Sequence, residues 1–460
     1  MTVAKHVFFL GLGGIGMSAL ARHLHSLGHV VGGYDLTPSP LLDRLKEEGV
    51  WVGHSDDPDD LPDWARQKTP TVVWTPAVPA DFRLKRHFES RGIQALKRAE
   101  LLGAITRNRP TLAVAGTHGK TTTSSWLADM LMAHPAGCHA FLGGIDTATG
   151  TNLLSRPDAE WHVVEADEFD RSFHQLHPTH AAVTNLDPDH LDVYGTEEAF
   201  REAFHVFGSQ VGQTLIVPHD LPWPHQKTLE RFAVVDLGGN VPEGVDHLAT
   251  LRPHARSVTF ELHRNNPDKT CSFEAAPALA GRHNTANALV AAALASHAHV
   301  EADVLAHRIE SFGGVKRRME VHLDTPEATY IDDYAHHPSE LEALLSAVRS
   351  RWPNRHVTMV FQPHLYSRTR DFGAEFARVL GQVDRLFLLP IYPAREAPIP
   401  GVDAQWLFDN ISSPDKHLVA SDSIFTSLKA CPVDVLVTAG AGDIDRLVPQ
   451  ALQHMQDRRK

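Results

Sequence analysis

Short apolar, β-branched runs alternate with helix-like stretches along most of the 460-residue chain. This alternation is typical of parallel α/β layers, in which each strand is followed by a helix. The pattern predicts three series of strands: His6–Leu10, Val30–Tyr34 and Thr71–Trp74; Thr111–Ala115, Trp161–Glu165, Ala181–Asn185 and Thr214–Pro218; Ala328–Asp332, Val357–Phe361, Arg385–Pro390 and Asp434–Thr438. The polar, proline-containing stretch from 218 to 278 predicts no clear strand order. We therefore expect an α/β fold of three domains, at residues 1–107, 108–312 and 313–460.

Composition narrows the classes of protein. The hydrophobic content of 42% suits packed cores, and no run approaches the roughly 20 apolar residues that would cross a bilayer. The net charge is −13 and no long basic run occurs, so we expect neither a nucleic acid nor a membrane as partner. Three widely spaced cysteines fit reduced thiols in a cytoplasmic protein.

A glycine-rich turn follows the first predicted strand. The segment Gly11-Leu-Gly13-Gly14-Ile-Gly16 precedes a helix predicted over Met17–Leu27. Such glycines bring backbone amides close to a diphosphate at a helix N-terminus, and Asp35 ends the next strand where a ribose-binding acid is expected. The turn by itself is compatible with three interpretations: a plain strand–helix turn, a dinucleotide site, or a site for another diphosphate.

A second loop predicts nucleotide triphosphate binding. Gly116-Thr-His-Gly119-Lys120-Thr121 lies between an apolar strand and a helix predicted over Ser124–Met132. Amides of such a loop wrap phosphates, its lysine reaches the β- and γ-phosphates, and its threonine hydroxyl binds Mg²⁺. The spacing is short, because Val114 occupies the position of the usual first glycine.

Acidic residues end the next two strands. Glu165-Ala-Asp-Glu168 follows one apolar run, and the segment 185–192, which contains His190, follows the other. In a parallel sheet these acids would lie beside the phosphate loop, where a Mg²⁺-binding carboxylate belongs. The alternatives are solvated loop charges and helix caps for the acids, and a purely structural role for His190, since Mg²⁺ prefers oxygen ligands.

Together these motifs resemble those of the Mur ligase family, and they cover nearly the whole chain in the family's order. The matching segments are Gly11–Ser18, Gly116–Thr123, Glu165–Glu168, Thr184–Asp192, Gly281–Ala288, Gly314–Arg318, Asp332–Pro338 and Phe361–Arg370. The resemblance implies an N-terminal Rossmann-like UDP-binding domain, a central P-loop ATPase-like domain and a C-terminal Rossmann-like domain.

The resemblance also implies a reaction, in which ATP converts the carboxylate of UDP-N-acetylmuramate to an acyl phosphate and L-alanine displaces phosphate to form an amide. This is a step of peptidoglycan synthesis, and it implies ATP and Mg²⁺, or Mn²⁺ in its place, as cofactors and a monomer or homodimer as the assembly. Two alternatives stay open. One is a related ligase that attaches a whole tripeptide to the same UDP-sugar in recycling, and the other is a non-catalytic switch that binds a UDP-sugar and ATP.

Carried over by position, the family's site residues fall into five groups. The catalytic group is Lys120, Glu165, His190, Arg318 and His336. The ATP group is Gly116, Thr117, His118, Gly119, Lys120, Thr121, Thr122, His283, Asn284, Asn287, Arg318 and Asp333. The UDP-sugar group is Gly13, Gly14, Ile15, Gly16, Met17, Ser18, Asp35, His54 and Thr75. The amino-acid group is His336, His364, Arg368 and Arg370. The metal group is Thr121, Glu165 and His190. Which arginine binds the alanine carboxylate is left open.

Overall fold

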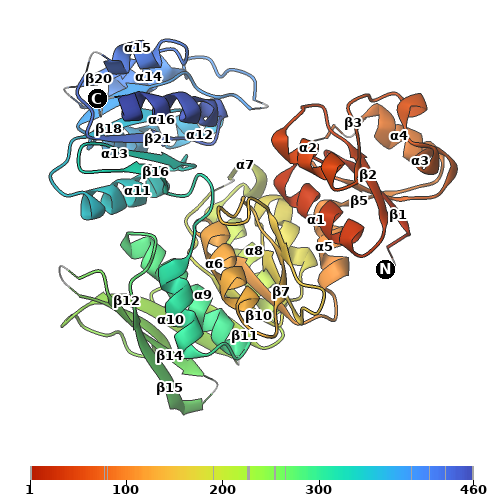
Figure 1. Cartoon of the computed structure of the whole chain (residues 1–460), viewed down its shortest axis with the longest axis horizontal. Coiled ribbons are helices and arrows are strands. Elements are labelled where there is room, and N and C mark those ends of the chain that lie inside the picture. Colours follow the sequence, from red (N-terminus) through yellow and green to blue (C-terminus); the bar gives the residue numbers. More distant parts are fainter. Residues whose placement is uncertain are drawn as a thin grey trace. The chain divides into compact units, whose positions relative to one another are not determined.

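The computed structural model describes residues 3–76, 78–79, 81–189, 191–224, 228–252, 255–264, 266–394, 396–413, 415–429 and 431–457. The chain divides into two compact units, residues 1–278 with 286–313, and residues 279–285 with 314–460. The first unit contains two sheets and the second contains one, and Figure 1 labels many of their elements. None of the described helices has the length and apolar character needed to cross a membrane.

The first sheet has five parallel strands in the order β3-β2-β1-β4-β5. Alternate residues of β1 face opposite cores: Val7 and Phe9 pack with α1, while Phe8 and Leu10 pack with α3 and α4. The elements are β1 His6–Leu10, α1 Ile15–Ser26, β2 Val30–Tyr34, α2 Pro40–Glu47, β3 Trp51–Gly53, η1 Pro58–Asp60, α3 Asp63–Gln67, β4 Thr71–Trp74, α4 Arg83–Ser90, β5 Ala95–Lys97 and α5 Arg98–Thr106.

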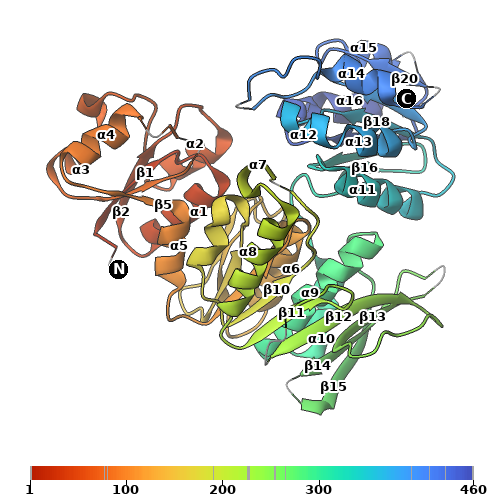
Figure 2. The same cartoon turned by 180° about the vertical axis from the view of Figure 1, so that it is seen from behind.

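The second sheet has ten strands, ordered β15-β14-β13-β12-β11-β10-β6-β9-β7-β8. Its centre is parallel, and α6 and α8 cover opposite faces, as Figures 1 and 2 show from the two sides. The elements are β6 Thr111–Ala115, α6 Lys120–Met132, β7 Cys138–Phe141, β8 Leu153–Ser155, β9 Trp161–Glu165, η2 Phe169–Gln175, β10 His180–Val183, α7 Leu191–Tyr194, α8 Glu197–Ser209, β11 Thr214–Pro218, β12 Leu229–Asp236, β13 His247–Leu251, β14 Val258–Arg264, β15 Asn266–Ala275, α9 Arg282–His297 and α10 Ala302–Ser311.

The third sheet has six strands in the order β16-β17-β21-β18-β19-β20, and only β16 runs antiparallel to its neighbour. Alternation again divides the core, because Met359 and Phe361 pack with α11 and α13 while Val360 packs with α15 and α16. The elements are β16 Glu320–Asp324, β17 Thr329–Asp333, α11 Pro338–Arg351, β18 Val357–Phe361, α12 Tyr366–Asp371, α13 Gly373–Leu380, β19 Arg385–Leu388, α14 Ala404–Asn410, β20 Lys416–Leu418, α15 Ile424–Lys429, β21 Val435–Ala439, η3 Asp443–Leu447 and α16 Val448–Asp457.

All eleven strands expected from the sequence are present, with ends that differ by at most two residues. The layers are mostly parallel, as the alternation predicted, and the antiparallel pairs β7–β8, β13–β14–β15 and β16–β17 lie at the sheet margins. The stretch 218–278, for which the sequence indicated no order, supplies four strands that extend the second sheet. An edge strand buries less apolar surface than a central one, so its sequence carries a weaker pattern.

Candidate active site

The phosphate loop of the first unit lies at the carboxyl end of β6, and α6 begins at Lys120 directly after it. Gly119 has a φ of 82°, a left-handed conformation that glycine adopts without strain. A Cβ at this position would lie 2.5 Å from Oδ1 of Asn287, so the close approach of α9 also requires glycine. The loop therefore has the local geometry of a phosphate-binding turn at a helix N-terminus.

Parallel pairing brings the acidic segments to this loop, as the sequence predicted. β6 pairs with β9 on one side, with Val114 opposite Glu165, and with β10 on the other, with Ala115 opposite Val183. The segment after β10 supports the loop: Asn185 Oδ1 accepts a hydrogen bond from the amide of His118 at 3.0 Å. Thr117 Oγ1 donates to the carbonyl of Asp187 at 2.6 Å. These two hydrogen bonds fix the loop to the segment that follows β10.

The ammonium group of Lys120 lies within this loop and contacts several oxygen atoms. Its Nζ donates to the carbonyl oxygens of Gly116, at 2.6 Å, and Thr117, at 3.1 Å, and pairs with Glu168 at 2.7 Å. Burial favours the neutral amine, but Glu168 and Glu165 outweigh it, so the pKa of Lys120 is raised. Burial raises the pKa of Glu168 to about 7 in spite of Lys120. The lysine stays cationic in an anion-binding loop.

Thr121 and Glu165 form the oxygen pair that the sequence analysis assigned to a metal. The Thr121 hydroxyl donates to Oε2 of Glu165 at 2.9 Å. A hydroxyl beside a carboxylate at the end of a strand is the donor set that Mg²⁺ prefers in phosphoryl-transfer sites. The third expected ligand, His190, lies outside the described residues, so the structure does not test it.

The other expected ATP residues are divided between the two units. Asn287 is buried on α9 of the first unit, and its Oδ1 accepts from Thr123 Oγ1 at 3.2 Å. Thr122 is also buried, in the first turn of α6. In the second unit, His283 is exposed, and Asn284 Nδ2 donates to the carbonyl of Ala280 at 2.8 Å. This hydrogen bond gives the Asn284 side chain a local structural role at the start of α9.

Residues of the expected UDP-sugar group meet at the carboxyl edge of the first sheet. The amide of Gly13 donates to Oδ2 of Asp35 at 2.7 Å, and the ring of His54 contacts the carbonyl of Asp35 at 2.8 Å. The methyl group of Thr75 lies 2.8 Å from where a Cβ on Gly11 would stand. Gly14 caps α1 without a side-chain hydrogen bond, which leaves backbone amides of the turn at the helix N-terminus.

Two members of that group have buried side chains. Met17 belongs to the hydrophobic core, and Ser18 donates to the carbonyl of Gly14 at 3.0 Å. Asn152, from the loop before β8, donates to Ser18 Oγ at 2.8 Å. The side chains of Met17 and Ser18 therefore pack at the start of α1, and the roles of both residues in UDP-sugar binding, like those of Gly13, Gly14, Ile15 and Gly16, stay predictions.

In the second unit, Arg318 lies in the loop before β16, and Asp333 is the last residue of β17. The oxygens of Asp333 accept from the amides of Met319, at 2.5 Å, and Ala335, at 2.7 Å. Burial raises the pKa of Asp333 to about 6. Arg317 and Met319 have φ values of 60° and 49°. Because such backbone is strained outside glycine, the loop that presents Arg318 is held in place by Asp333 rather than by local preference.

His336, His364 and Arg368 come together in the same unit. The rings of His336 and His364 have centroids 5.9 Å apart, and Nη1 of Arg368 lies 3.5 Å from Nδ1 of His364. Burial, with His336 and Arg368, lowers the pKa of His364 to about 3, so its ring is neutral. Arg370 is different, because its side chain is exposed and pairs with Asp371 at 2.7 Å. The structure brings three of the four expected amino-acid residues together.

Sequence reasoning missed two charged residues at these sites. Glu168 was quoted in a motif but not assigned, although it pairs with Lys120. Arg98, at the start of α5, lies beside Gly16, where a Cβ would stand 3.1 Å from its Nη1, and it pairs with Asp167 at 3.1 Å. The basic pair Lys97-Arg98, at the end of β5 and the start of α5, was the available sequence signal. Arg98 adds a cation to the glycine turn.

Comparison with known proteins agrees with this geometry. Family models match three consecutive parts of the chain: "Mur ligase family, catalytic domain" at residues 6–110, "Mur ligase middle domain" at 114–295 and "Mur ligase, glutamate ligase domain" at 317–444. The chain belongs to the Mur ligase family. Members of this family are ATP-dependent ligases that form amide bonds.

Two curated relatives match over nearly their full length. The UDP-N-acetylmuramate–L-alanine ligase of Porphyromonas gingivalis strain W83 is 43% identical over 98% of this chain and 99% of its own. The enzyme of the same name from Flavobacterium johnsoniae is 42% identical over 97% and 96%. Among solved structures, the UDP-N-acetylmuramate-alanine ligase of Thermotoga maritima has the same fold, with a TM-score of 0.80 and 24% identity over 98% of this chain and 99% of that one.

Proposed function

We propose that this chain joins L-alanine to UDP-N-acetylmuramate at the expense of ATP, giving UDP-N-acetylmuramoyl-L-alanine, ADP and phosphate for peptidoglycan synthesis. The relatives that bear this name match at more than 40% identity from end to end. Residues 1–107 would bind the UDP-sugar, 108–312 would bind ATP, and 313–460 would bind the amino acid. We expect the reaction to take place in the cytoplasm, where ATP is available.

The observation that carries this proposal is the joint placement of Lys120, Thr121 and Glu165 at the carboxyl edge of the second sheet. The Lys120 ammonium would exchange its carbonyl partners for the phosphates of ATP. Thr121 and Glu165 would hold Mg²⁺, which supplies positive charge against the phosphates. A carboxylate oxygen of the sugar then attacks the γ-phosphorus and ADP leaves, which produces an acyl phosphate. The loop thereby offsets the repulsion between two anions.

The second half of the reaction needs a neutral amine and a bound amino-acid carboxylate. The amine nitrogen attacks the acyl carbon, phosphate leaves, and one proton must be removed from nitrogen. His336 is suited to accept or orient that proton, since the contact of its Nδ1 with the carbonyl of Tyr334, at 2.9 Å, favours the tautomer in which Nε2 is an acceptor. Arg368 is suited to bind the alanine carboxylate with paired hydrogen bonds.

In the first domain, amides of Gly14, Ile15 and Gly16, together with Arg98, would bind the diphosphate of the UDP-sugar. The amide of Gly13 is engaged by Asp35, so that carboxylate positions the turn in addition to any contact with the sugar. This interpretation replaces that of a dinucleotide site at the glycine turn, because no step of the proposed reaction is a redox step.

A panel of complete reactions tests the proposed function. The purified chain, with Mg²⁺ and UDP-N-acetylmuramate, is supplied with ATP and with L-alanine, glycine, L-serine or the recycling tripeptide, and the product is identified by mass. We expect phosphate release that requires all reactants and an amide product with L-alanine. A tripeptide product would assign the recycling reaction instead, and phosphate release that needs no amine would identify a switch.

A further inference from the structure

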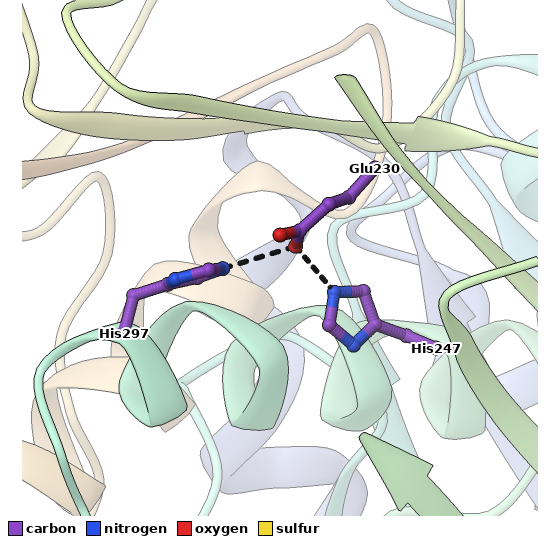
Figure 3. Close-up of side chains that lie close together, drawn as sticks. All are labelled: Glu230, His247 and His297. Carbon is purple, nitrogen blue, oxygen red and sulfur yellow. Dashed lines mark hydrogen bonds and ion pairs between the residues drawn. The ribbon is translucent and has the colours of Figure 1, made fainter. Parts of the chain in front are cut away.

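A buried group of one carboxylate and two imidazoles lies in the first unit, outside the phosphate loop and the glycine turn. Glu230 is the second residue of β12, His247 the first of β13 and His297 the last of α9. Nε2 of His247 lies 2.7 Å from Oε2 of Glu230, and Nε2 of His297 lies 3.0 Å from the same oxygen. Figure 3 shows both imidazole rings directed at this oxygen, that of His247 from β13 and that of His297 from α9.

We propose that Glu230, His247 and His297 bind one divalent transition-metal ion of the Zn²⁺ type. Their donor atoms lie within 4.8 Å of one another. Two imidazole nitrogens with one carboxylate oxygen are a common three-ligand set for zinc, with a water as the fourth ligand. Nitrogen donors select against Mg²⁺ and Ca²⁺, which take oxygen. The ion would therefore differ in kind from the Mg²⁺ used with ATP.

Burial and charge favour a cation at this position. The side chains of His247 and His297 are 0% and 1% exposed, and that of Glu230 is 16% exposed. A carboxylate in such a buried place is costly without a counter-charge, which a metal ion bound by the three side chains would supply.

A third histidine packs against this group, because His180 stacks on His297 with ring centroids 4.6 Å apart. The second unit offers a contrast in the cluster of Glu320, His322 and Asp332. There the Arg317 guanidinium lies 3.2 Å from Asp332, so the protein itself supplies the positive charge.

The geometry needs a small change to admit an ion. Metal–ligand bonds of about 2.0–2.1 Å in a tetrahedron place ligand atoms about 3.3 Å apart. The present separations of 2.7 and 3.0 Å are hydrogen-bond lengths, so the Glu230 oxygen must withdraw by a few tenths of an ångström. Rotation of this side chain, the most exposed of the three, provides that movement and an entry path.

The ion would be structural rather than catalytic. Asn287, which contacts the phosphate-loop helix through Thr123, precedes His297 by ten residues on α9. Ten helical residues span about 15 Å, which is too far for an ion at His297 to touch a phosphate. Binding would instead tie the C-terminal end of α9 to the first residues of β12 and β13, two strands that the sequence pattern did not predict.

Cobalt substitution tests the site directly in the full-length protein. CoCl₂ is titrated in excess MgCl₂, which occupies oxygen-ligand sites, and visible absorption is recorded, since a tetrahedral nitrogen–oxygen site absorbs much more strongly than an octahedral oxygen site. We expect one equivalent of Co²⁺ with intense bands that ZnCl₂ abolishes, and a rise in the unfolding temperature with ZnCl₂. Glu230→Gln, which has nearly the same shape, should lose both effects.

Two further variants separate a specific site from general histidine binding. His162→Gln removes a buried histidine that lies in the same sheet but does not contact Glu230. This variant should bind Co²⁺ as the wild type does. His247→Cys keeps a metal donor at position 247, and it should retain binding with a new thiolate-to-cobalt band. Absence of intense bands in the wild type, or bands that persist unchanged in Glu230→Gln, would show that the three side chains only hydrogen-bond to one another.

Discussion

The Nζ atom of Lys120 lies 2.7 Å from Oε2 of Glu168, a carboxylate whose side chain is 2% exposed. The partners are 48 residues apart and meet because β6 and β9 are adjacent parallel strands. A buried pair of this kind contributes less to stability than it costs to break, because removal of one partner leaves the other charge uncompensated. Lys120 therefore has a structural role beside the catalytic role proposed for it, and the two are separable.

The first prediction separates them with two variants. Lys120→Met should lower kcat/KM for ATP by about 10²–10³-fold, the loss expected for one electrostatic contact to the transferring group. At pH 8 it should also reduce the free energy of unfolding by about 3 kcal/mol, because Glu168 is then buried without its counter-ion. Adding Glu168→Gln should restore most of the stability and none of the activity. Urea unfolding and phosphate release measure the two quantities. Equal stabilities of the single and double variants would mean that Glu168 is neutral at pH 8.

The second prediction concerns the oxygen pair of Thr121 and Glu165. Thr121→Val keeps the side-chain shape but removes the hydroxyl, so half-maximal phosphate release should need at least about tenfold more Mg²⁺, in line with the 10–100-fold losses seen when the groups around a metal are changed. Thr121→Ser keeps the hydroxyl and is the matched control, with an Mg²⁺ requirement close to that of the wild type. If Val and Ser variants respond alike to Mg²⁺, this hydroxyl is not a metal ligand.

The parts of the fold that the sequence predicted are those with strong local patterns. The first strand, the glycine turn and the helix after it are specified within about 20 residues, since buried strands are continuously apolar and the turn requires glycine. In contrast, β15 has the sequence NPDKTCSFEA, which is polar along most of its length. It is a strand because β14 pairs with it antiparallel at the sheet edge, and such long-range pairing has no signature in a single segment.

The candidate site also contains residues that local motifs identified and residues that they did not. Loop motifs identified Lys120, Thr121 and Glu165 because each follows a strand end at a fixed spacing. Glu168 was not singled out, since nothing in the local sequence indicates which acid of Glu165–Glu168 contacts the lysine. The group of Glu230, His247 and His297 has separations of 17 and 50 residues and no motif, so only the folded chain brings it together.

The third prediction decides between the two arginines left open by the sequence. Arg368 is buried beside His364, whereas Arg370 is exposed and paired with Asp371. Arg368→Lys should raise KM for L-alanine at least about tenfold, since a hydrogen-bonded contact to a charged group contributes about 1.5–3 kcal/mol. Arg370→Lys should change KM by less than about twofold, as expected for an exposed ion pair. The opposite ranking in initial-rate measurements would assign the carboxylate to Arg370.

The fourth prediction concerns His336 and the amine. His336→Gln should slow amide formation by about 10²-fold, the lower range for the loss of a positioned proton acceptor. Formation of the acyl phosphate should change much less, which can be measured by trapping it with hydroxylamine, a nucleophile that is neutral at the assay pH. The variant's rate with L-alanine should also recover as pH rises, because the free amine becomes more abundant. Equal loss in both assays would indicate a structural role for His336.

The fifth prediction is a pH dependence of stability. Burial, reinforced by His139, lowers the pKa of His162 from 6.5 to about 4, so the unfolded chain binds a proton there that the folded chain does not at pH 4–6.5. The stabilisation is present above pH 6.5 and is lost as the pH falls toward 4. Between pH 7.5 and 5.0 this one group should remove about 2 kcal/mol of unfolding free energy.

Urea titrations at the two pH values measure this loss. In His162→Gln the loss of unfolding free energy should be smaller by about that amount. In His177→Gln, at an exposed position, the loss should be the same as in the wild type. An unaltered pH difference in His162→Gln would mean that this ring is protonated equally in the folded and unfolded chain.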